Sequence, residues 1–573
     1  MLIFSYILLT YAFAIGSANA VPSHKPSADL PTVVLDNATF IGSSDGAIDK
    51  FFGISFALPP TGNLRFRLPE PAGPYNGTHN ATNFGLSCPQ QSQDIFQEAD
   101  IPNLATALGI PREEPAPGEG EDCESPSYVM TCLSLMKDTL GLNLNVWAPS
   151  GAQSNANLSV FVVRIIRGFE DGSNSADDGG TIVQRSIELG EPIIYVSMNY
   201  RHSAFGFLAS KEVEDAGVGN LGLWDQRQAL RWVQKYIGVF GGNATRVTIG
   251  GESAGAMSTA LQMVTNGGNT EGLFRGAFMS SGAPIPVGNI THGQKYYDAL
   301  VDETGCAGEA DTLECLRNVP YDELKAAVDK SPNQYSTQAL NLAWLPRTDG
   351  KFLTAPPLHL VLNGSVANVP FINGNCDDEG TAFSLPSALK LDIQTDDQFV
   401  AWMTETYFPT VPENRLNELF TLYPDDPAQG SPFDTGNRNR LTRQYKRMAA
   451  LQGDLGFQAP RRFFLQQRSG KQDSWAYLFK GKKSTPFLGS YHSSDVPSYF
   501  GPGDLTDYLI NFVNHLDPNG RNVEIEWPKY DNTSLNLLTL TGNSAPYHLN
   551  ITLDDFRVDG MNLLTNLSLD YPL

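Results

Sequence analysis

Residues 220–264 read NLGLWDQRQALRWVQKYIGVFGGNATRVTIGGESAGAMSTALQMV, and this stretch contains three predicted elements in a row. Residues 221–239 place apolar side chains at helical spacing, and Gly241-Gly242 ends that helix. Residues 247–249 are a β-branched run typical of a buried strand, and an apolar helical pattern resumes from Ala256. The order helix, strand, turn, helix predicts an α/β fold.

The turn between this strand and the second helix reads Gly251-Glu252-Ser253-Ala254-Gly255, a G-x-S-x-G pattern. Between a strand and a helix, the pattern is typical of a tight turn that projects a serine hydroxyl from the sheet. A bare G-x-S-x-G is often only a glycine-rich turn, so the prediction depends on the two flanking elements. Ser253 is the predicted nucleophile, and Glu252 beside it either shapes the electrostatics or makes local hydrogen bonds.

A nucleophilic serine needs a base to remove its proton and a carboxylate to orient and stabilise that base. Of the histidines after the serine, only His492 lies in a loop-like run of small residues, LGSYHSSDVPSYFG, and it is the predicted base. Three adjacent acids, Asp377, Asp378 and Glu379, follow a strand predicted over residues 369–372. The residue types alone leave the choice among these three acids open.

These motifs are part of a longer set through which the sequence resembles the type-B carboxylesterase/lipase family. In the family's order, the chain contains FFGISFALPPTGNLRFRLPEP, NVWAP, VSMNYRHSAFGFL, NLGLWDQRQALRWV, FGGN, GESAG, FRGAFMSSGAP, CDDEGTAF, YHSSDV and WPKY. The resemblance implies an α/β-hydrolase fold, with a central mostly parallel sheet flanked by helices and with long insertions. It also implies a carboxylic ester hydrolase that forms an acyl-enzyme without a cofactor or a metal. Ser253 is then the nucleophile, Glu379 the acid and His492 the base.

One loop departs from the family's pattern. Members usually carry Gly-Gly-Gly-Phe after a strand, and backbone N–H groups of that run help to hold the oxyanion. Here the corresponding residues are Ile166, Arg167, Gly168 and Phe169. The resemblance makes Arg167, Gly168 and Ala254 the expected oxyanion donors. The changed loop also supports a second hypothesis, a cholinesterase-like binding or adhesion protein that is impaired in catalysis.

The resemblance further implies two disulfides, Cys88 with Cys123 and Cys306 with Cys315. The first closes the loop that serves as a lid in the family's lipases. Residues 101–110 in that loop, IPNLATALGI, suit either a short amphipathic helix in transient contact with a lipid surface or a plain surface helix. Residues 124–139 are an insertion relative to the family, which we interpret as translated intron or another gene-model error. Sequencing the transcript tests this interpretation.

The N-terminus and the composition predict a secreted, extracellular protein. Residues 1–20, MLIFSYILLTYAFAIGSANA, are almost wholly apolar and end in a small-residue cleavage pattern, so we predict a signal peptide before one domain over residues 21–573. An uncleaved N-terminal anchor is the alternative. Ten Asn-x-Ser/Thr sequons fit secretion, at Asn37, Asn76, Asn80, Asn157, Asn243, Asn289, Asn363, Asn532, Asn550 and Asn566. The formal charge of -23 disfavours nucleic acid and anionic membranes, which leaves a small-molecule ester or lipid as the expected partner.

Overall fold

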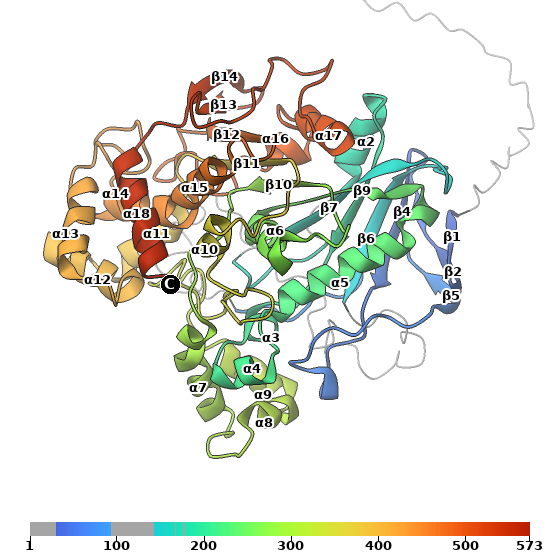
Figure 1. The fold of residues 1–573 in the computed structure, drawn as a ribbon, viewed down its shortest axis with the longest axis horizontal. Coiled ribbons are helices and arrows are strands. Elements are labelled where there is room, and N and C mark those ends of the chain that lie inside the picture. Colours follow the sequence, from blue (N-terminus) through green and yellow to red (C-terminus); the bar gives the residue numbers. More distant parts are fainter. Residues whose placement is uncertain (1–29, 93–141, 167, 176–177) are drawn as a thin grey trace, which may run out of the picture.

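An 11-stranded sheet runs through the computed structural model, which describes residues 30–92, 142–166, 168–175 and 178–573, with the backbone alone for 164–166. Its order is β14-β13-β12-β11-β10-β9-β7-β8-β6-β4-β3, and a 3-stranded sheet, β1-β2-β5, lies at one end (Figure 1). The strands are β1 Thr32–Leu35, β2 Asn37–Ile41, β3 Ser43–Ser44, β4 Ile48–Ser55, β5 Asn76–Asn80, β6 Asn143–Pro149, β7 Leu158–Ile166, β8 Ile193–Met198, β9 Gly242–Ser253, β10 Gly276–Ser280, β11 Phe371–Cys376, β12 Ser474–Gly481, β13 Asn536–Gly542 and β14 His548–Leu553.

The middle of this sheet is parallel and its two margins are antiparallel. Neighbours from β8 through β7, β9, β10, β11 and β12 to β13 pair in parallel. β14 pairs antiparallel with β13, and β6, β4 and β3 continue antiparallel from β8. Parallel strands need crossover connections, and these connections supply the covering helices. The sheet is mostly parallel, as the sequence predicts.

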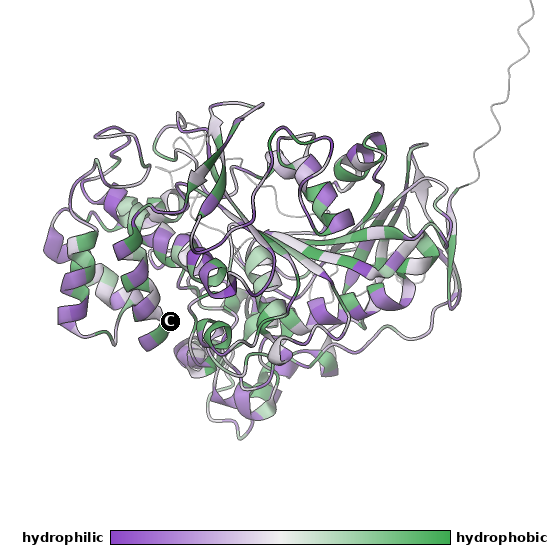
Figure 2. Ribbon diagram, turned by 45° about the horizontal axis from the view of Figure 1, so that its top comes forward, coloured by the Kyte–Doolittle hydropathy of each residue, from purple (hydrophilic) through white to green (hydrophobic). Residues whose placement is uncertain are grey.

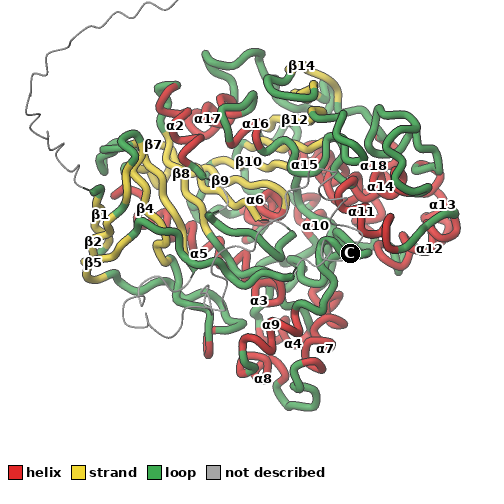
Figure 3. The backbone as a smooth tube through the Cα atoms, turned by 180° about the vertical axis from the view of Figure 1, so that it is seen from behind, coloured by secondary structure: helices red, strands yellow, loops and turns green. Residues whose placement is uncertain are grey.

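Helices cover both faces of the sheet. α5, α6 and α10 lie on one face, whereas α2, α16 and α17 lie on the other (Figures 1 and 3). The α-helices are α2 Gly180–Glu188, α3 Ser203–Phe207, α4 Lys211–Ala216, α5 Leu221–Tyr236, α6 Ala254–Val264, α7 Gln294–Glu303, α8 Thr312–Asn318, α9 Tyr321–Val328, α10 Pro357–Leu362, α11 Thr381–Lys390, α12 Asp396–Tyr407, α13 Glu413–Leu422, α14 Tyr445–Gly453, α15 Ala459–Arg468, α16 Pro497–Phe500, α17 Thr506–His515 and α18 Val558–Asp570. Short 3-10 helices span Gly62–Leu64, Ile237–Phe240, Asn266–Gly268 and Ile290–Gly293, and a π-helix spans Asp454–Gln458.

The two faces of the sheet pack into two separate cores. In β7, Val160 and Val162 belong to the core under α5 and α6, whereas Phe161 and Val163 belong to the core under α2 and α17. This alternation follows from the two-residue repeat of a strand. Because both faces are covered, residues 160–163 of the strand are a continuous apolar run rather than an alternating one. Figure 2 shows the hydrophobic strands in the middle of the molecule, between helices of mixed hydropathy.

The stretch from 220 to 264 folds in the predicted order. The first helix runs over Leu221–Tyr236, and Gly241 follows its 3-10 extension with a φ of 92°. β9 and α6 then meet directly at Ser253 and Ala254. The strand predicted over residues 369–372 is displaced, since β11 spans Phe371–Cys376 and continues through an Asn-Gly-Asn sequence that resembles a turn.

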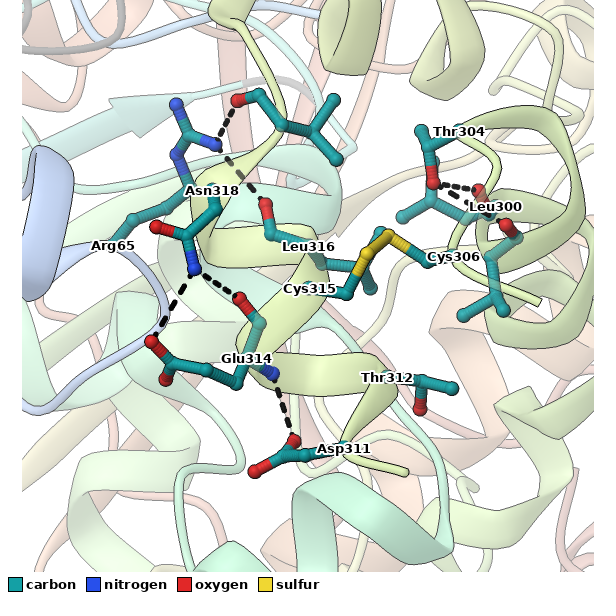
Figure 4. Close-up of a disulfide and its surroundings, with 12 residues drawn as sticks. Arg65, Leu300, Thr304, Cys306, Asp311, Thr312, Glu314, Cys315, Leu316 and Asn318 are labelled. Atoms are coloured by element: carbon teal, nitrogen blue, oxygen red, sulfur yellow. Dashed lines mark hydrogen bonds between the residues drawn. A yellow bond between two sulfur atoms is a disulfide. The ribbon is translucent and has the colours of Figure 1, made fainter. Parts of the chain in front are cut away.

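The described residues contain a disulfide between Cys306 and Cys315, with the two Cα atoms 5.7 Å apart. Cys306 follows α7 and Cys315 lies within α8, so the bridge ties the end of one helix to the next (Figure 4). Cys88 is also disulfide-bonded. Cys123 lies outside the described residues, so its predicted pairing with Cys88 stays a prediction. The predicted surface helix of residues 101–110 and the insertion of residues 124–139 lie outside them as well.

No helix in the described part of the chain is both long and apolar enough to cross a membrane.

Candidate active site

Ser253 lies at the junction of β9 and α6, in a backbone conformation that few non-glycine residues adopt. Its φ is 54° and its ψ is -125°. Such strain is maintained only where the surrounding structure enforces it, and it is common at functional sites. The loop after β10 passes close to this turn, because a Cβ atom at Gly282 would lie 2.8 Å from the Ser253 carbonyl oxygen. The sharp turn leaves the hydroxyl of Ser253 facing a pocket.

Three predicted residues from distant parts of the sequence meet at this turn. His492 Nε2 lies 2.8 Å from Ser253 Oγ, and His492 Nδ1 lies 2.5 Å from Glu379 Oε2. Ser253 ends β9, whereas Glu379 and His492 follow β11 and β12, and the carboxyl ends of these strands lie along one edge of the parallel sheet. Phe383 and Phe457 flank the imidazole, with ring centroids 5.0 and 4.7 Å from its own. The arrangement can pass a proton from the hydroxyl to an oriented base.

The structure separates the three adjacent acids. Asp377 and Asp378 face Lys483, whose Nζ lies 2.5 and 2.7 Å from their carboxylates. Glu379 points the other way, toward His492, and its Oε1 accepts a hydrogen bond of 2.7 Å from the Cys376 amide. Hydrogen bonds hold the turn that contains Glu379 against the loop that contains His492.

The contacts between the two segments involve Asp378 and Ser490. The Asp378 amide donates to the Ser490 carbonyl oxygen at 3.0 Å, and the Ser490 amide donates to Asp378 Oδ2 at 2.7 Å. These two bonds hold the turn of Glu379 beside the loop of His492. Asp378 therefore contributes to the geometry of the site, although it does not touch the imidazole in the structure.

A second buried carboxylate lies beside the imidazole. Glu252 Oε1 lies 3.3 Å from His492 Nε2 and accepts a hydrogen bond of 2.6 Å from Ser493 Oγ. Burial raises the pKa of Glu252 to about 7. Burial opposes the charged form of His492 as well, but the charges of Glu379 and Glu252 outweigh it and raise the pKa of His492 above its ordinary value. The sequence suggests that Glu252 either shapes the electrostatics of the site or makes local hydrogen bonds, and its contacts with His492 and Ser493 are consistent with both roles.

The Glu252→Gln variant is expected to move the acid limb of the pH profile of kcat/KM to lower pH by about one unit. The base must be neutral to accept a proton, and a nearby negative charge favours its protonated form. Removing that charge lowers the pKa of His492, so the neutral base persists at lower pH. Kinetics on a soluble ester across pH measure the shift. Ser493→Ala is the control, because it removes the hydrogen bond and keeps the carboxylate. An unchanged acid limb in Glu252→Gln would show that the charge of Glu252 does not raise the pKa of His492.

Two of the three expected oxyanion donors lie in the described residues. Gly168 and Ala254 line the same pocket as Ser253, whereas Arg167 lies outside the described residues. Gly168 has a φ of 60°, and a Cβ atom there would lie 2.6 Å from Gln334 Oε1. The backbone conformation therefore favours glycine at this position, and any larger residue would also force the Gln334 side chain to move.

A Gly168→Ala variant is expected to lose about 100-fold or more in kcat, because the strained backbone would carry its N–H away from the developing oxyanion. KM should change little, since this contact strengthens in the transition state. Steady-state kinetics on a short-chain ester measure both constants. Combining Gly168→Ala with Gln334→Ala relieves the contact but not the positive φ, so activity should recover only in part. Full activity in Gly168→Ala would exclude a backbone role for this residue.

The pocket beside Ser253 is lined mainly by apolar side chains. It encloses about 690 Å³ of empty space, part of it open to solvent. Its lining comprises Gly168, Phe169, Ser253, Ala254, Met257, Ile285, Pro286, Val287, Gln334, Leu340, Leu342, Leu345, Phe383, Tyr407, Leu455, Gly456, Phe457 and Leu573. Most of these side chains lie in loops and helices between the sheet strands. Apart from Gly168, Ser253 and Ala254, sequence reasoning missed these residues, because no local pattern links residues that converge only in the folded chain.

The chain is similar to known proteins along nearly its whole length. The model of the carboxylesterase family matches residues 31–556. Lipase 4 of Diutina rugosa is 37% identical over 556 residues, which are 94% of this chain and 96% of that protein. A secreted triacylglycerol lipase of Gibberella zeae is 35% identical over 570 residues, 96% of this chain and 92% of that protein. The crystal structure of Aspergillus niger EstA matches with a TM-score of 0.77 and 26% identity, covering 94% of this chain and 98% of that one.

The mostly parallel sheet, its helix layers and the serine turn after β9 define an α/β-hydrolase, and the predicted fold class is confirmed. Within that class, the chain belongs to the carboxylesterase family. Membership also confirms the predicted enzyme class, a carboxylic ester hydrolase.

Proposed function

We propose that the chain is a secreted serine lipase that cleaves carboxylic esters through Ser253, His492 and Glu379. The continuous contact from Ser253 Oγ through the imidazole to Glu379 is the observation that supports this proposal. His492 accepts the proton of the hydroxyl as Ser253 attacks the ester carbonyl, and it returns a proton to the leaving alcohol. Water then attacks the acyl-enzyme by the same route and releases the acid.

The oxyanion that forms at each attack needs hydrogen-bond donors. The backbone N–H of Ala254, at the start of α6, and that of Gly168 are the proposed donors among the described residues, with Arg167 as a third candidate. The N-terminus of α6 also favours negative charge at this position. Apart from the ester and water, each step of this mechanism uses groups of the chain itself.

The apolar lining of the pocket favours a long acyl chain over acetate. Met257, Leu455 and Phe457 offer only hydrocarbon, sulfur and aromatic surface to a substrate. The lipases among the relatives are consistent with this preference. A secreted relative and the apolar first twenty residues support cleavage of a signal peptide and an extracellular location.

Hydrolysis of p-nitrophenyl esters from acetate to palmitate tests the proposal. Each methylene that enters the pocket contributes about 0.8 kcal/mol, so kcat/KM should rise about fourfold per methylene over the first few carbons. Met257→Trp, which fills the pocket next to the serine, should remove this gain and leave acetate hydrolysis largely unchanged. A flat profile in the unaltered chain would overturn the lipase assignment. A folded chain without activity on any ester would instead favour the binding or adhesion protein.

A further inference from the structure

The central sheet has one open edge. β14 pairs antiparallel with β13 over six residues, from His548 to Leu553, and no strand of the described residues pairs with its other side. Figures 1 and 3 show β14 at the margin of the molecule. An edge strand presents unpaired N–H and C=O groups to which a strand of another chain can bind.

This edge lacks the features that usually prevent such pairing. Five of the six residues of β14 are exposed, including Ile551 at 40% and Leu553 at 52% of their surface. Its sequence, HLNITL, contains no proline, lysine or acidic residue, and its register with β13 is unbroken. The opposite edge is different, because β3 is only the two residues Ser43–Ser44. Short edge strands and edge charges are common protections, and β14 has neither of them.

The middle of β14 carries a sequon, Asn550-Ile551-Thr552. Asn550 and Thr552 are exposed and lie on one face of the strand, opposite Ile551 and Leu553. Thr552 Oγ1 lies 2.6 Å from Thr539 Oγ1 on β13. The Asn550 side chain has no hydrogen bond within the described parts of the chain, whereas the Asn243 and Asn532 side-chain amides donate to neighbouring groups. Modification of Asn550 therefore breaks no side-chain hydrogen bond of the described residues.

We propose that Asn550 carries an N-linked glycan that prevents the edge of β14 from pairing with a second copy of this chain. The inference rests on the proposed secretion, since the modification requires the secretory pathway. A transferase there forms a bond between Asn550 Nδ2 and C1 of the first sugar. The bond from C1 to the diphosphate of a lipid-linked oligosaccharide donor breaks, the lipid diphosphate leaves, and the amide loses one proton. A bulky hydrated group in the centre of the strand then excludes another backbone.

Glycopeptide mass spectrometry on the full chain, secreted by a eukaryotic host, tests the modification. We expect the peptide containing Asn550 to carry a glycan, and the same peptide to be unmodified in Asn550→Gln. Thr552→Ser is the matched control, because it retains both the sequon and a hydroxyl facing Thr539. If other sequons carry glycans and Asn550 does not, the glycosylation of Asn550 is overturned and the proposed secretion stands. Failure of the host to export the chain into the medium would instead overturn the secretion on which the proposal rests.

Light scattering after size-exclusion chromatography tests the protective role. Asn550→Gln should shift toward dimers and larger species relative to the unaltered chain, whereas Thr552→Ser should not. Adding Ile551→Lys to Asn550→Gln should restore the original profile, because a charge on the edge opposes strand pairing. Ser253 ends β9, which lies five positions from β14 in the sheet order. Ester hydrolysis should therefore be unchanged, and it reports that each variant is folded. An Asn550→Gln profile identical to that of the unaltered chain would overturn the role, and so would association that Ile551→Lys does not reduce.

Discussion

Ser253→Ala is expected to lower kcat by about a million-fold, and His492→Ala alone should cost nearly as much. The two side chains act as one unit, since a serine without its base is a weak nucleophile and a base without the serine has no proton to accept. The double variant should therefore be little worse than either single variant. Steady-state kinetics on a soluble short-chain ester measure all three losses.

The fold should survive the loss of the Ser253 hydroxyl. Alanine removes one atom and tolerates a φ of 54° no worse than serine does, so thermal unfolding should be unchanged. Ser258→Ala is the matched control on the same helix. Its hydroxyl accepts a hydrogen bond of 3.1 Å from Gln226 and lies one turn beyond the site, so stability should fall slightly and kcat should not.

A covalent probe supplies an independent readout of the same prediction. An organophosphonate ester should label the unaltered chain once, on the peptide that contains Ser253, and should not label Ser253→Ala. Residual activity above about a thousandth of the original in Ser253→Ala would mean that another nucleophile performs the reaction. Labelling at a different residue would identify that nucleophile.

The sequence predicts the serine turn well because every signal for it is local. A β-branched run, the G-x-S-x-G pattern and an apolar helical repeat lie within twenty residues of Ser253. The base was recognisable for a weaker reason, a loop of small residues around His492. The choice of Glu379 came from the family resemblance, because no local pattern indicates which of three adjacent carboxylates faces the imidazole.

The displacement of β11 has a tertiary cause. The run Asn373-Gly374-Asn375 is typical of a turn, but all three residues are buried in the strand. The Asn373 amide donates to the carbonyl oxygens of Met279 and Gly282, and a Cβ atom at Gly374 would meet the ring of Tyr477. Contacts with neighbouring strands thus override the local turn preference. The rest of the pocket lining could not be predicted for the same reason, since those residues approach one another only after the sheet forms.

Glu379→Gln is expected to lower kcat by about ten-thousand-fold while leaving the fold intact. The reason lies in the hydrogen bonds at both ends of the carboxylate. Oε1 accepts from the Cys376 amide, so glutamine would keep its oxygen there and turn its NH₂ group toward His492 Nδ1. The imidazole would then have to present a lone pair at Nδ1 and carry its proton on Nε2. In that tautomer it faces Ser253 with a donor and cannot accept the hydroxyl proton.

Asp377→Asn provides the matched control, because it removes a charge two residues away on the side of Lys483. Asp377→Asn should lower the melting temperature and keep kcat. Glu379→Gln should keep the melting temperature and lower kcat. Loss of the Glu379 charge also removes an interaction that raises the pKa of His492, so any residual activity should persist to lower pH. Glu252 cannot substitute for Glu379, since it lies 3.3 Å from Nε2 rather than beside Nδ1. If Glu379→Gln kept more than about a tenth of kcat, orientation of His492 through Nδ1 would not be essential, and the assignment of Glu379 as the acid would be wrong.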